Sequence, residues 1–226
     1  MIPVLTPEEM REVDAAAPDP VDVLVARAGA AVARSAVRLL GGTYGRRVTV
    51  VAGKGNNGVD GREAADILAR RGTRVLVVDA ADAPAALPAC DLVVDAAYGT
   101  GFRGEYRAPD AGGAPVLAVD IPSGVDGLTG EAGDGAVRAG HTVTFAALKP
   151  GLLLGAGRDH AGVVEVVDIG LDVSAARAHL VDDGDAALLP RRPRDAHKWQ
   201  SAVFVAGGSA GMAGAAVLAG RSALRA

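Results

Sequence analysis

Polar residues able to do chemistry follow several β-branched segments of this sequence. Asn56, Asn57 and Asp60 stand in "GNNGVDG", Asp95 leads into "DAAYGTGFRGE", and Asp120 leads into "DIPSGVDG". Ligands of doubly wound sheets bind beyond the carboxyl ends of the strands, so we expect these segments to form one site. For any one segment alone, the turn and capping preferences of Asp, Asn and Gly are an equally good explanation.

Asn57, Asp95 and Ser123 together offer an amide oxygen, a carboxylate and a hydroxyl. These are hard oxygen donors with one formal negative charge, which favours a monovalent cation over Mg²⁺ or Ca²⁺, with backbone carbonyls of the glycine turns as further ligands. In "GTGFRG", the glycines allow backbone N-H groups to approach a phosphate, and Arg103 is available as its charge partner. The segments therefore predict a cation site beside an anion site.

Two residues are candidates for proton transfer. Asp120 precedes a Pro-Ser turn at the end of a predicted strand, and a carboxyl group over an apolar sheet acquires a raised pKa suited to general acid or base catalysis. Lys149, in "ALKPGL", is the second candidate, for proton transfer or for phosphate binding. A solvated lysine in a turn is the competing interpretation of Lys149.

A dinucleotide-binding fingerprint opens the first of these segments. Gly53, Gly55 and Gly58 have the GxGxxG spacing, and Asp79 ends the next apolar run, where a ribose partner is expected. Taken alone, this pattern predicts an NAD-dependent oxidoreductase. Two asparagines directly after the second glycine, and four histidines in positions that suit no hydride transfer, argue against it. An oxidoreductase and a non-catalytic dinucleotide-binding module remain the alternatives to an enzyme of another class.

The elements that position these residues alternate along the chain. They predict an α/β fold, with a three-layer αβα, Rossmann-like, doubly wound and mostly parallel sheet. Thr6 and Glu9 form a capping box that starts a helix running to about Ala17. Further helices are expected at 21–40 and 61–71, and strands at 47–52, 74–78, 91–95, 116–120, 141–145 and 163–168.

Composition limits the classes of partner. Half of the 226 residues are apolar, only 3% are aromatic, and the formal net charge is -4 without a basic tract, so we expect no nucleic acid partner. Cys90 is the only cysteine, which excludes a disulfide framework and fits a reducing compartment. No long apolar run or amino-terminal signal pattern is present, so we expect a cytoplasmic protein without a membrane partner.

The chain changes character near Leu180. We expect a first domain at 1–178, a polar, proline-containing linker at 179–198, and the truncated start of a second domain at 199–226. The last segment predicts a strand at 202–206, a glycine loop "GGSAGMAG" and an alanine-rich helix. Such a short unit cannot bury a core of its own.

From about Leu5 to Val173 the chain resembles the NAD(P)HX epimerase family, the amino-terminal half of the bifunctional NAD(P)H-hydrate repair enzyme. The resemblance rests on "LTPEEMREVD", "AGKGNNGVDG", "DAAYGTGFRG", "VDIPSGVDG", "TVTFAALKPGLL" and "GVVEVVDIG". It implies an isomerase for metabolite repair, which interconverts the R and S epimers of hydrated NADH or NADPH (NADHX and NADPHX). A homodimer formed through the amino-terminal helices is expected only by this resemblance.

The resemblance also implies roles for residues. One potassium ion (K⁺) per site is expected on Asn57, Asp95 and Ser123. Val59 stands where the family usually has glycine, and its β-branched side chain is expected to narrow the site or to forbid a positive φ. Asp110 stands where many members have tyrosine, and either change is expected to weaken substrate binding. The substrate contacts fall on Asn56, Asn57, Gly58, Val59, Asp60, Gly99, Thr100, Gly101, Phe102, Arg103, Gly104, Glu105 and Asp120.

The tail, from "HKWQSAVFVAGG" onward, resembles the start of an ADP- or ATP-dependent NAD(P)H-hydrate dehydratase domain with a ribokinase-like fold. Dehydration of the S epimer, a lyase activity, is therefore expected only of a longer chain.

Overall fold

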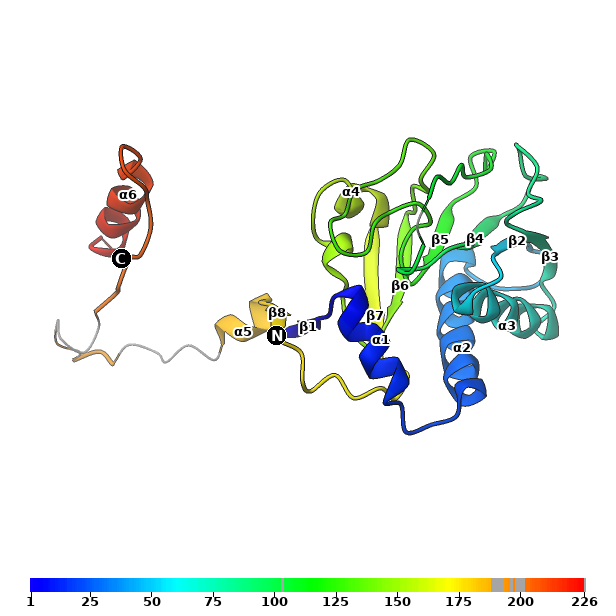
Figure 1. Cartoon of the computed structure of the whole chain (residues 1–226), viewed down its shortest axis with the longest axis horizontal. Coiled ribbons are helices and arrows are strands. Elements are labelled where there is room, and N and C mark those ends of the chain that lie inside the picture. The colour runs from blue at the N-terminus through cyan, green and yellow to red at the C-terminus, as the bar shows by residue number, and fades with distance from the viewer. Residues whose placement is uncertain (103, 188–192, 196, 198–201, 226) are drawn as a thin grey trace. The chain divides into compact units, whose positions relative to one another are not determined.

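The computed structural model describes residues 1–102, 104–187, 193–195, 197 and 202–225. The chain divides into two compact units, Met1–Val181 and Asp182–Ala226. The elements of both units are labelled in Figure 1.

Unit 1 contains a six-stranded parallel sheet with the strand order β3-β2-β4-β5-β6-β7. The chain begins this sheet at β2, passes to β3 on one side and then crosses back to β4 on the other. The order therefore reverses between β2 and β4, which is where open α/β sheets bind ligands. The predicted parallel sheet is confirmed, and the strands are β2 (Arg47–Ala52), β3 (Arg74–Asp79), β4 (Leu92–Ala96), β5 (Val116–Val119), β6 (His141–Phe145) and β7 (Val163–Val167).

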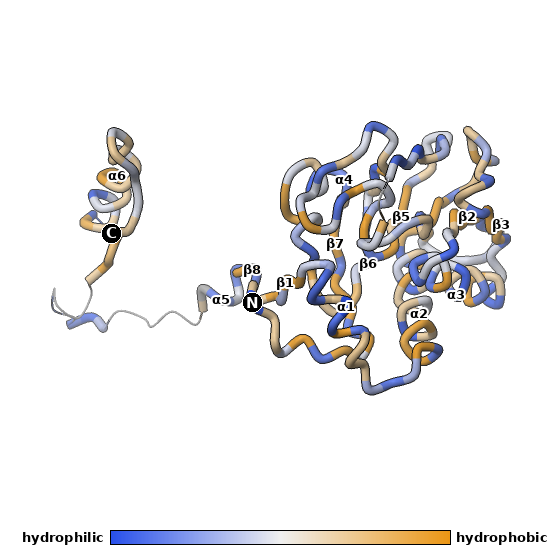
Figure 2. Tube along the Cα trace, viewed as in Figure 1, coloured by the Kyte–Doolittle hydropathy of each residue, from blue (hydrophilic) through white to orange (hydrophobic). Residues whose placement is uncertain are grey.

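Helices α1 (Pro7–Ala15), α2 (Val21–Leu40) and α3 (Asn56–Arg70) share one core with the sheet. In that core Val50 of β2 is fully buried together with Val32 of α2. Val51, the next residue, belongs to a separate core on the opposite face, as the alternation of side chains along a strand requires. Loops, η1 (Pro150–Leu152) and α4 (Gly157–Ala161) contribute to the remaining cores. Figure 2 shows hydrophobic residues along β2 and β7 and a mixture around α3.

The first helix begins as the capping box predicts. Thr6 Oγ1 accepts a hydrogen bond from the Glu9 backbone N-H at 3.2 Å, and Glu9 Oε2 accepts one from the Thr6 N-H at 2.8 Å. The second helix has the predicted bounds and ends at Gly41, whose φ of 66° lies in the left-handed region that glycine adopts readily. These local signals set the start of α1 and the end of α2.

The third helix begins at Asn56 and not at the predicted Gly61. A Cβ at Gly58 would lie 1.9 Å from the Gly53 carbonyl oxygen, so glycine at 58 lets the helix start directly against the end of β2. Glycine and asparagine are poor helix formers, which is why the sequence pattern missed this first turn. Asn56, Asn57 and Asp60 consequently lie on a helix and not in a loop.

Two short strands were not predicted. β1 (Ile2–Val4) pairs antiparallel with β8 (Ala178–Leu180), so that His179 and Leu180, predicted as linker, lie in unit 1. The assignment of 179–198 as a linker between two domains stays a prediction.

Unit 2 contains α5 (Asp183–Ala186) and α6 (Gly214–Ala223), the second being the predicted alanine-rich helix. The predicted strand at 202–206 is wrong, because no described residue supplies the hydrogen-bonded partner that a strand requires. Within the described ranges, no helix is long and apolar enough to cross a membrane.

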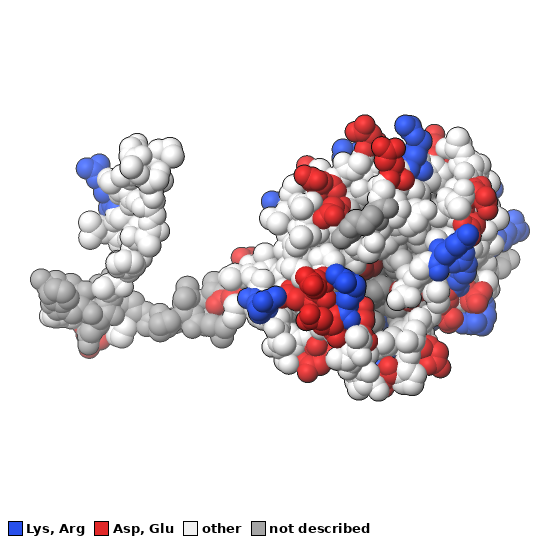
Figure 3. All heavy atoms as spheres, viewed as in Figure 1, with Lys and Arg blue, Asp and Glu red and all other residues white. Residues whose placement is uncertain are grey.

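The charged side chains on the face of unit 1 drawn in Figure 3 are interspersed, with Lys and Arg lying among Asp and Glu. The face shown carries no continuous basic surface of the kind that binds a phosphate backbone.

Candidate active site

A pocket of about 500 Å³ in unit 1 opens at the carboxyl ends of β2, β4 and β5. It lies beside the point where the strand order reverses, and α1, α2 and the first turns of α3 supply much of its wall. The pocket brings together many of the residues predicted from the sequence, namely Asn56, Asn57, Asp60, Gly99, Thr100, Gly101, Phe102, Asp120 and Lys149.

Several predicted contacts do not line this pocket. Gly58 is packed against the backbone of Gly53, and Gly104 and Glu105 are exposed. Arg103 lies outside the described residues. For these positions the expected substrate contacts stay predictions.

The two departures from the family pattern also lie outside the pocket lining. Val59 has helical backbone geometry in α3 and is 43% exposed, so its side chain neither narrows the pocket nor needs a positive φ. The structure therefore does not support the expectation that Val59 narrows the site, and the role of Val59 as a substrate contact stays a prediction. Asp110 is exposed, its backbone forms a β-bridge with Ala86, and its carboxylate accepts a hydrogen bond from the Gly112 N-H at 2.9 Å.

Asp120 follows β5 and has a φ of 66°, an uncommon conformation for a residue other than glycine. Backbone strain of this kind persists where surrounding structure enforces it, and it clusters at functional sites. The Nζ of Lys149 donates to Asp120 Oδ1 at 2.5 Å and to the hydroxyl of Thr144 at 2.8 Å. Thr144 in turn donates to the same Oδ1 at 3.2 Å.

The two carboxylate oxygens of Asp120 have different hydrogen-bond partners. Oδ1 is occupied by Lys149 and Thr144, whereas no residue in the described part of the chain is found donating to Oδ2. A Cβ placed on Gly99 would lie 3.6 Å from Oδ2, so the absence of a side chain at 99 keeps the space beside Oδ2 open. Lys149 is only 1% exposed. The competing interpretation of Lys149 as a solvated lysine in a turn is therefore wrong.

Asp95 and Ser123 are buried beside the pocket and bound to each other. Ser123 donates to Asp95 through its hydroxyl at 2.7 Å and through its backbone N-H at 2.8 Å. Burial raises the pKa of Asp95 to about 6, and the hydrogen bonds from Ser123 and the Ala97 N-H act against this rise.

The side chain of Asn57 is 8% exposed, and neither its amide oxygen nor its amide nitrogen has a hydrogen-bond partner. Buried polar groups are rarely left unpaired, so an unpartnered amide that lines a pocket indicates a site for a ligand, ion or water. A cation would satisfy the oxygen of Asn57, and the oxygen chemistry of Asn57, Asp95 and Ser123 suits a monovalent ion. Asp95 and Ser123 do not line the pocket, so a shared ion site on the three residues stays a prediction.

Two further carboxyl groups face the same pocket. Burial, and to a smaller extent the charges of Asp120 and Asp14, raise the pKa of Asp60 to about 8. Burial also raises the pKa of Asp14, with the Lys149 charge acting in the opposite direction and the Asp120 charge in the same direction. Sequence reasoning missed Asp14, although its spacing of four residues from Met10, a residue of the buried core, places both on one face of α1.

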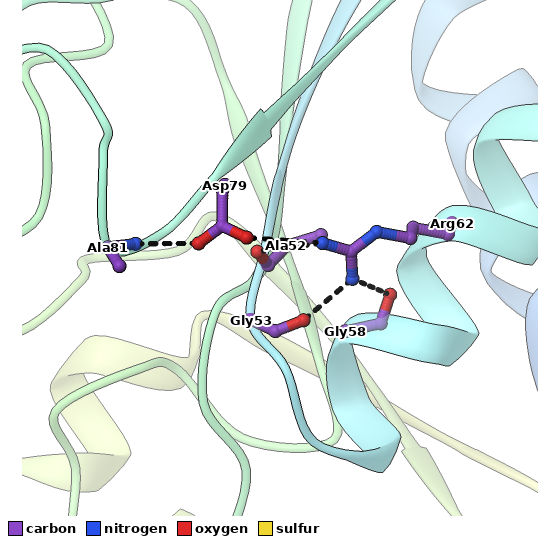
Figure 4. Close-up of polar contacts among 6 residues, drawn as sticks. All are labelled: Ala52, Gly53, Gly58, Arg62, Asp79 and Ala81. Atoms are coloured by element: carbon purple, nitrogen blue, oxygen red, sulfur yellow. Dashed lines mark hydrogen bonds and ion pairs between the residues drawn. The ribbon is translucent and has the colours of Figure 1, made fainter.

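The fingerprint residue Asp79 lies away from this pocket and is bound to protein groups (Figure 4). Arg62 of α3 reaches Asp79 Oδ2 at 3.7 Å and donates to the carbonyl oxygens of Gly53 at 2.6 Å and Gly58 at 3.2 Å. Asp79 also accepts a hydrogen bond from the Ala81 N-H at 3.0 Å. The guanidinium thus joins the glycine turn to Asp79, which argues against the ribose contact that the fingerprint predicts.

Comparison with known proteins identifies relatives over most of the chain. Residues 21–86 and 79–151 match the family model described as YjeF-related protein N-terminus. The bifunctional NAD(P)H-hydrate repair enzyme of Pyrobaculum aerophilum is 37% identical over an alignment of 246 residues, which covers 90% of this chain and 48% of that enzyme. The enzyme of the same name from Escherichia coli is 34% identical, covering 80% of this chain and 43% of that enzyme.

The chain thus spans about half the length of the curated relatives that it matches. Among solved structures, yeast ynu0 aligns with a TM-score of 0.54 and 21% identity, covering 73% of this chain and 87% of the yeast chain. That likeness supports the fold.

Proposed function

Since the chain belongs to the YjeF-related protein N-terminus family, we propose that unit 1 is an isomerase that interconverts the R and S epimers of hydrated NADH and NADPH. The observation that carries this proposal is the ion pair between the buried Lys149 and the partly exposed Asp120, which both line the pocket, with Asp120 in a strained backbone conformation. Its role is metabolite repair, because the relatives are named as repair enzymes.

The chemistry requires a proton donor and acceptor at one carbon. Carbon 6 of the hydrated nicotinamide carries a hydroxyl group and the ring nitrogen, so epimerisation needs that hydroxyl to leave and return, or the ring to open and close. Both routes need proton transfer. Asp120 performs it through Oδ2, while Lys149 and Thr144 hold Oδ1 and fix the orientation of the carboxylate.

The pocket suits part of a dinucleotide in size and lining. Its volume of about 500 Å³ falls in the range of small-molecule sites. Asn56, Asn57 and Asp60 enter from α3, and residues 99–102 enter from the loop after β4. The expected contacts of 103–105 belong to the same proposal.

A potassium ion would be held by Asn57, Asp95 and Ser123, in keeping with the unpartnered amide of Asn57. When bound, the ion supplies a fixed positive charge that satisfies these oxygens and stiffens the segments carrying them. Potassium chloride is then expected to raise the midpoint of thermal unfolding more than N-methylglucamine chloride at equal ionic strength. Asn57→Ala is expected to abolish the difference, and an unchanged difference would contradict this ion site.

The proposed activity is tested by giving the full chain one purified epimer of hydrated NADPH in potassium buffer. Chromatography then follows the second epimer. Appearance faster than the spontaneous rate supports the proposal. Binding of the hydrate without acceleration would favour a non-catalytic dinucleotide-binding module.

The remaining assignments are narrower proposals. A homodimer follows from the family resemblance, and a cytoplasmic location from the single cysteine, Cys90. Dehydration of the S epimer belongs, in this proposal, to a longer chain that continues the ribokinase-like segment.

A further inference from the structure

Asp60 and Asp14 are carboxyl groups of the pocket that take no part in the proton transfer described so far. They reach the pocket from two helices, α3 and α1, whereas Asp120 reaches it from the end of β5. The unpartnered side chain of Asn57, one helical turn before Asp60, faces the same space. Carboxyl groups from separate elements therefore converge on one cavity that holds an unsatisfied buried amide.

Inversion of a carbon centre benefits from proton-transfer groups on more than one wall. If the hydroxyl of carbon 6 leaves from one face of the ring and water adds to the other, a single fixed carboxylate cannot serve both faces equally. Building on the proposed epimerase function, we propose that Asp60 is a second proton-transfer group of this reaction and that Asp14 is its positioning residue.

The step balances without any further reactant. Asp60 gives its proton to the hydroxyl oxygen as the bond from carbon 6 to oxygen breaks, and the electron pair of that bond leaves with the water formed. The ring nitrogen lone pair then forms a double bond to carbon 6. A water molecule adds to the opposite face, and its proton passes to Asp120. Exchange with solvent returns Asp60 and Asp120, which is partly exposed, to their starting states.

The charges around Asp60 favour a proton donor at neutral pH. Asp14 from α1 and Asp120 from β5 raise the pKa of Asp60 in addition to burial. Among the described residues that line the same pocket, Lys149 and Arg11 are the cationic groups. The Lys149 Nζ donates its hydrogen bonds to Asp120 Oδ1, the Thr144 hydroxyl and the Phe145 carbonyl. Lys149 therefore gives no hydrogen bond to Asp60.

The first test compares Asp60→Asn with Asp66→Asn, which makes the same change on the exposed side of α3. Positioned acid-base groups contribute about 100-fold or more, so Asp60→Asn is expected to lower the kcat of epimerisation by about that factor. Asp66→Asn is expected to keep the wild-type rate. Asp60→Glu is expected to recover part of the lost rate, which a structural role would not explain.

The second test measures the protonation state of Asp60 directly by NMR. In protein labelled with ¹³C at aspartate carboxyl groups, one resonance is expected to titrate near pH 8, to vanish in Asp60→Asn and to stay in Asp66→Asn. Asp14→Asn removes one repulsive charge, so the titration of Asp60 and the alkaline fall of kcat are both expected to move to lower pH.

The outcomes separate the two proposals. If the wild-type chain does not accelerate epimerisation, the proposed function is wrong and this inference fails with it. If the wild-type chain does accelerate it, but Asp60→Asn keeps the same kcat and pH profile, the epimerase stands and the role of Asp60 is overturned. Absence of a resonance titrating near pH 8 would overturn it as well.

Discussion

Asp60→Asn is expected to change how the stability of the protein depends on pH. The pKa of Asp60 is about 8 in the folded chain, against 3.8 for an ordinary aspartate. Below the lower value both the folded and the unfolded states carry the proton. As pH rises from there, the unfolded state ionises while the folded state stays protonated, so the free energy of unfolding falls until pH passes the folded pKa.

The size of this effect follows from the difference between the two pKa values. A difference of about 4 units corresponds to about 5 kcal/mol at about 1.36 kcal/mol per unit. Water in the open pocket screens the ionised group, so we expect about 2 kcal/mol or more to be measurable. Asparagine has nearly the same shape and does not ionise, so the variant lacks this contribution.

The assay is urea unfolding of the full chain, followed by far-UV circular dichroism at about pH 5 and about pH 8.5. The stability of Asp60→Asn relative to wild type is expected to rise by about 2 kcal/mol between these conditions. Asp66→Asn is the control and is expected to follow the wild-type dependence. Parallel pH curves for wild type and Asp60→Asn would refute the assignment of a raised pKa to Asp60.

Other substitutions test the placement of α1 and α3. Val59→Gly is expected to leave kcat/KM of epimerisation unchanged and to cost about 1 kcal/mol of stability, since Val59 lies on a helix outside the pocket; a large gain in activity would contradict this placement. Gly58→Ala is expected to cost about 2 kcal/mol in urea unfolding, because its Cβ would meet the Gly53 carbonyl, whereas Gly101→Ala, with open space around it, costs little. Thr6→Ala is expected to cost about 1 kcal/mol and to raise KM through a loosened α1, and unchanged hydrogen exchange in α1 would count against that reasoning.

The sheet was predictable because its strands are runs rich in β-branched residues, and the inner strands, of which β2 is the clearest, are buried on both faces. The start of α1 was predictable because a capping box is a local signal. The start of α3 at Asn56 was not, because it depends on a tertiary contact between Gly58 and Gly53 and on Arg62 bridging the turn. Short strands such as β1 lack the length that periodicity needs.

In the candidate site, sequence spacing placed Asp120 and Asn57 because both follow strands that end at one edge of the sheet. The contribution of Asp14 was missed because α1 reaches the pocket only through tertiary packing. The contact between Lys149 and Asp120 could not be predicted from the sequence either, because it joins two groups from separate loops.

The most direct test of the central claim compares wild type with Asp120→Asn in the conversion of one purified epimer of hydrated NADPH. Asparagine adopts the left-handed conformation readily, so the variant keeps the backbone at this position while losing the carboxylate. Circular dichroism first verifies that the fold is intact. The account predicts that wild type accelerates the conversion and that Asp120→Asn lowers kcat by about 100-fold or more. A full epimerisation rate in a folded Asp120→Asn protein would contradict it.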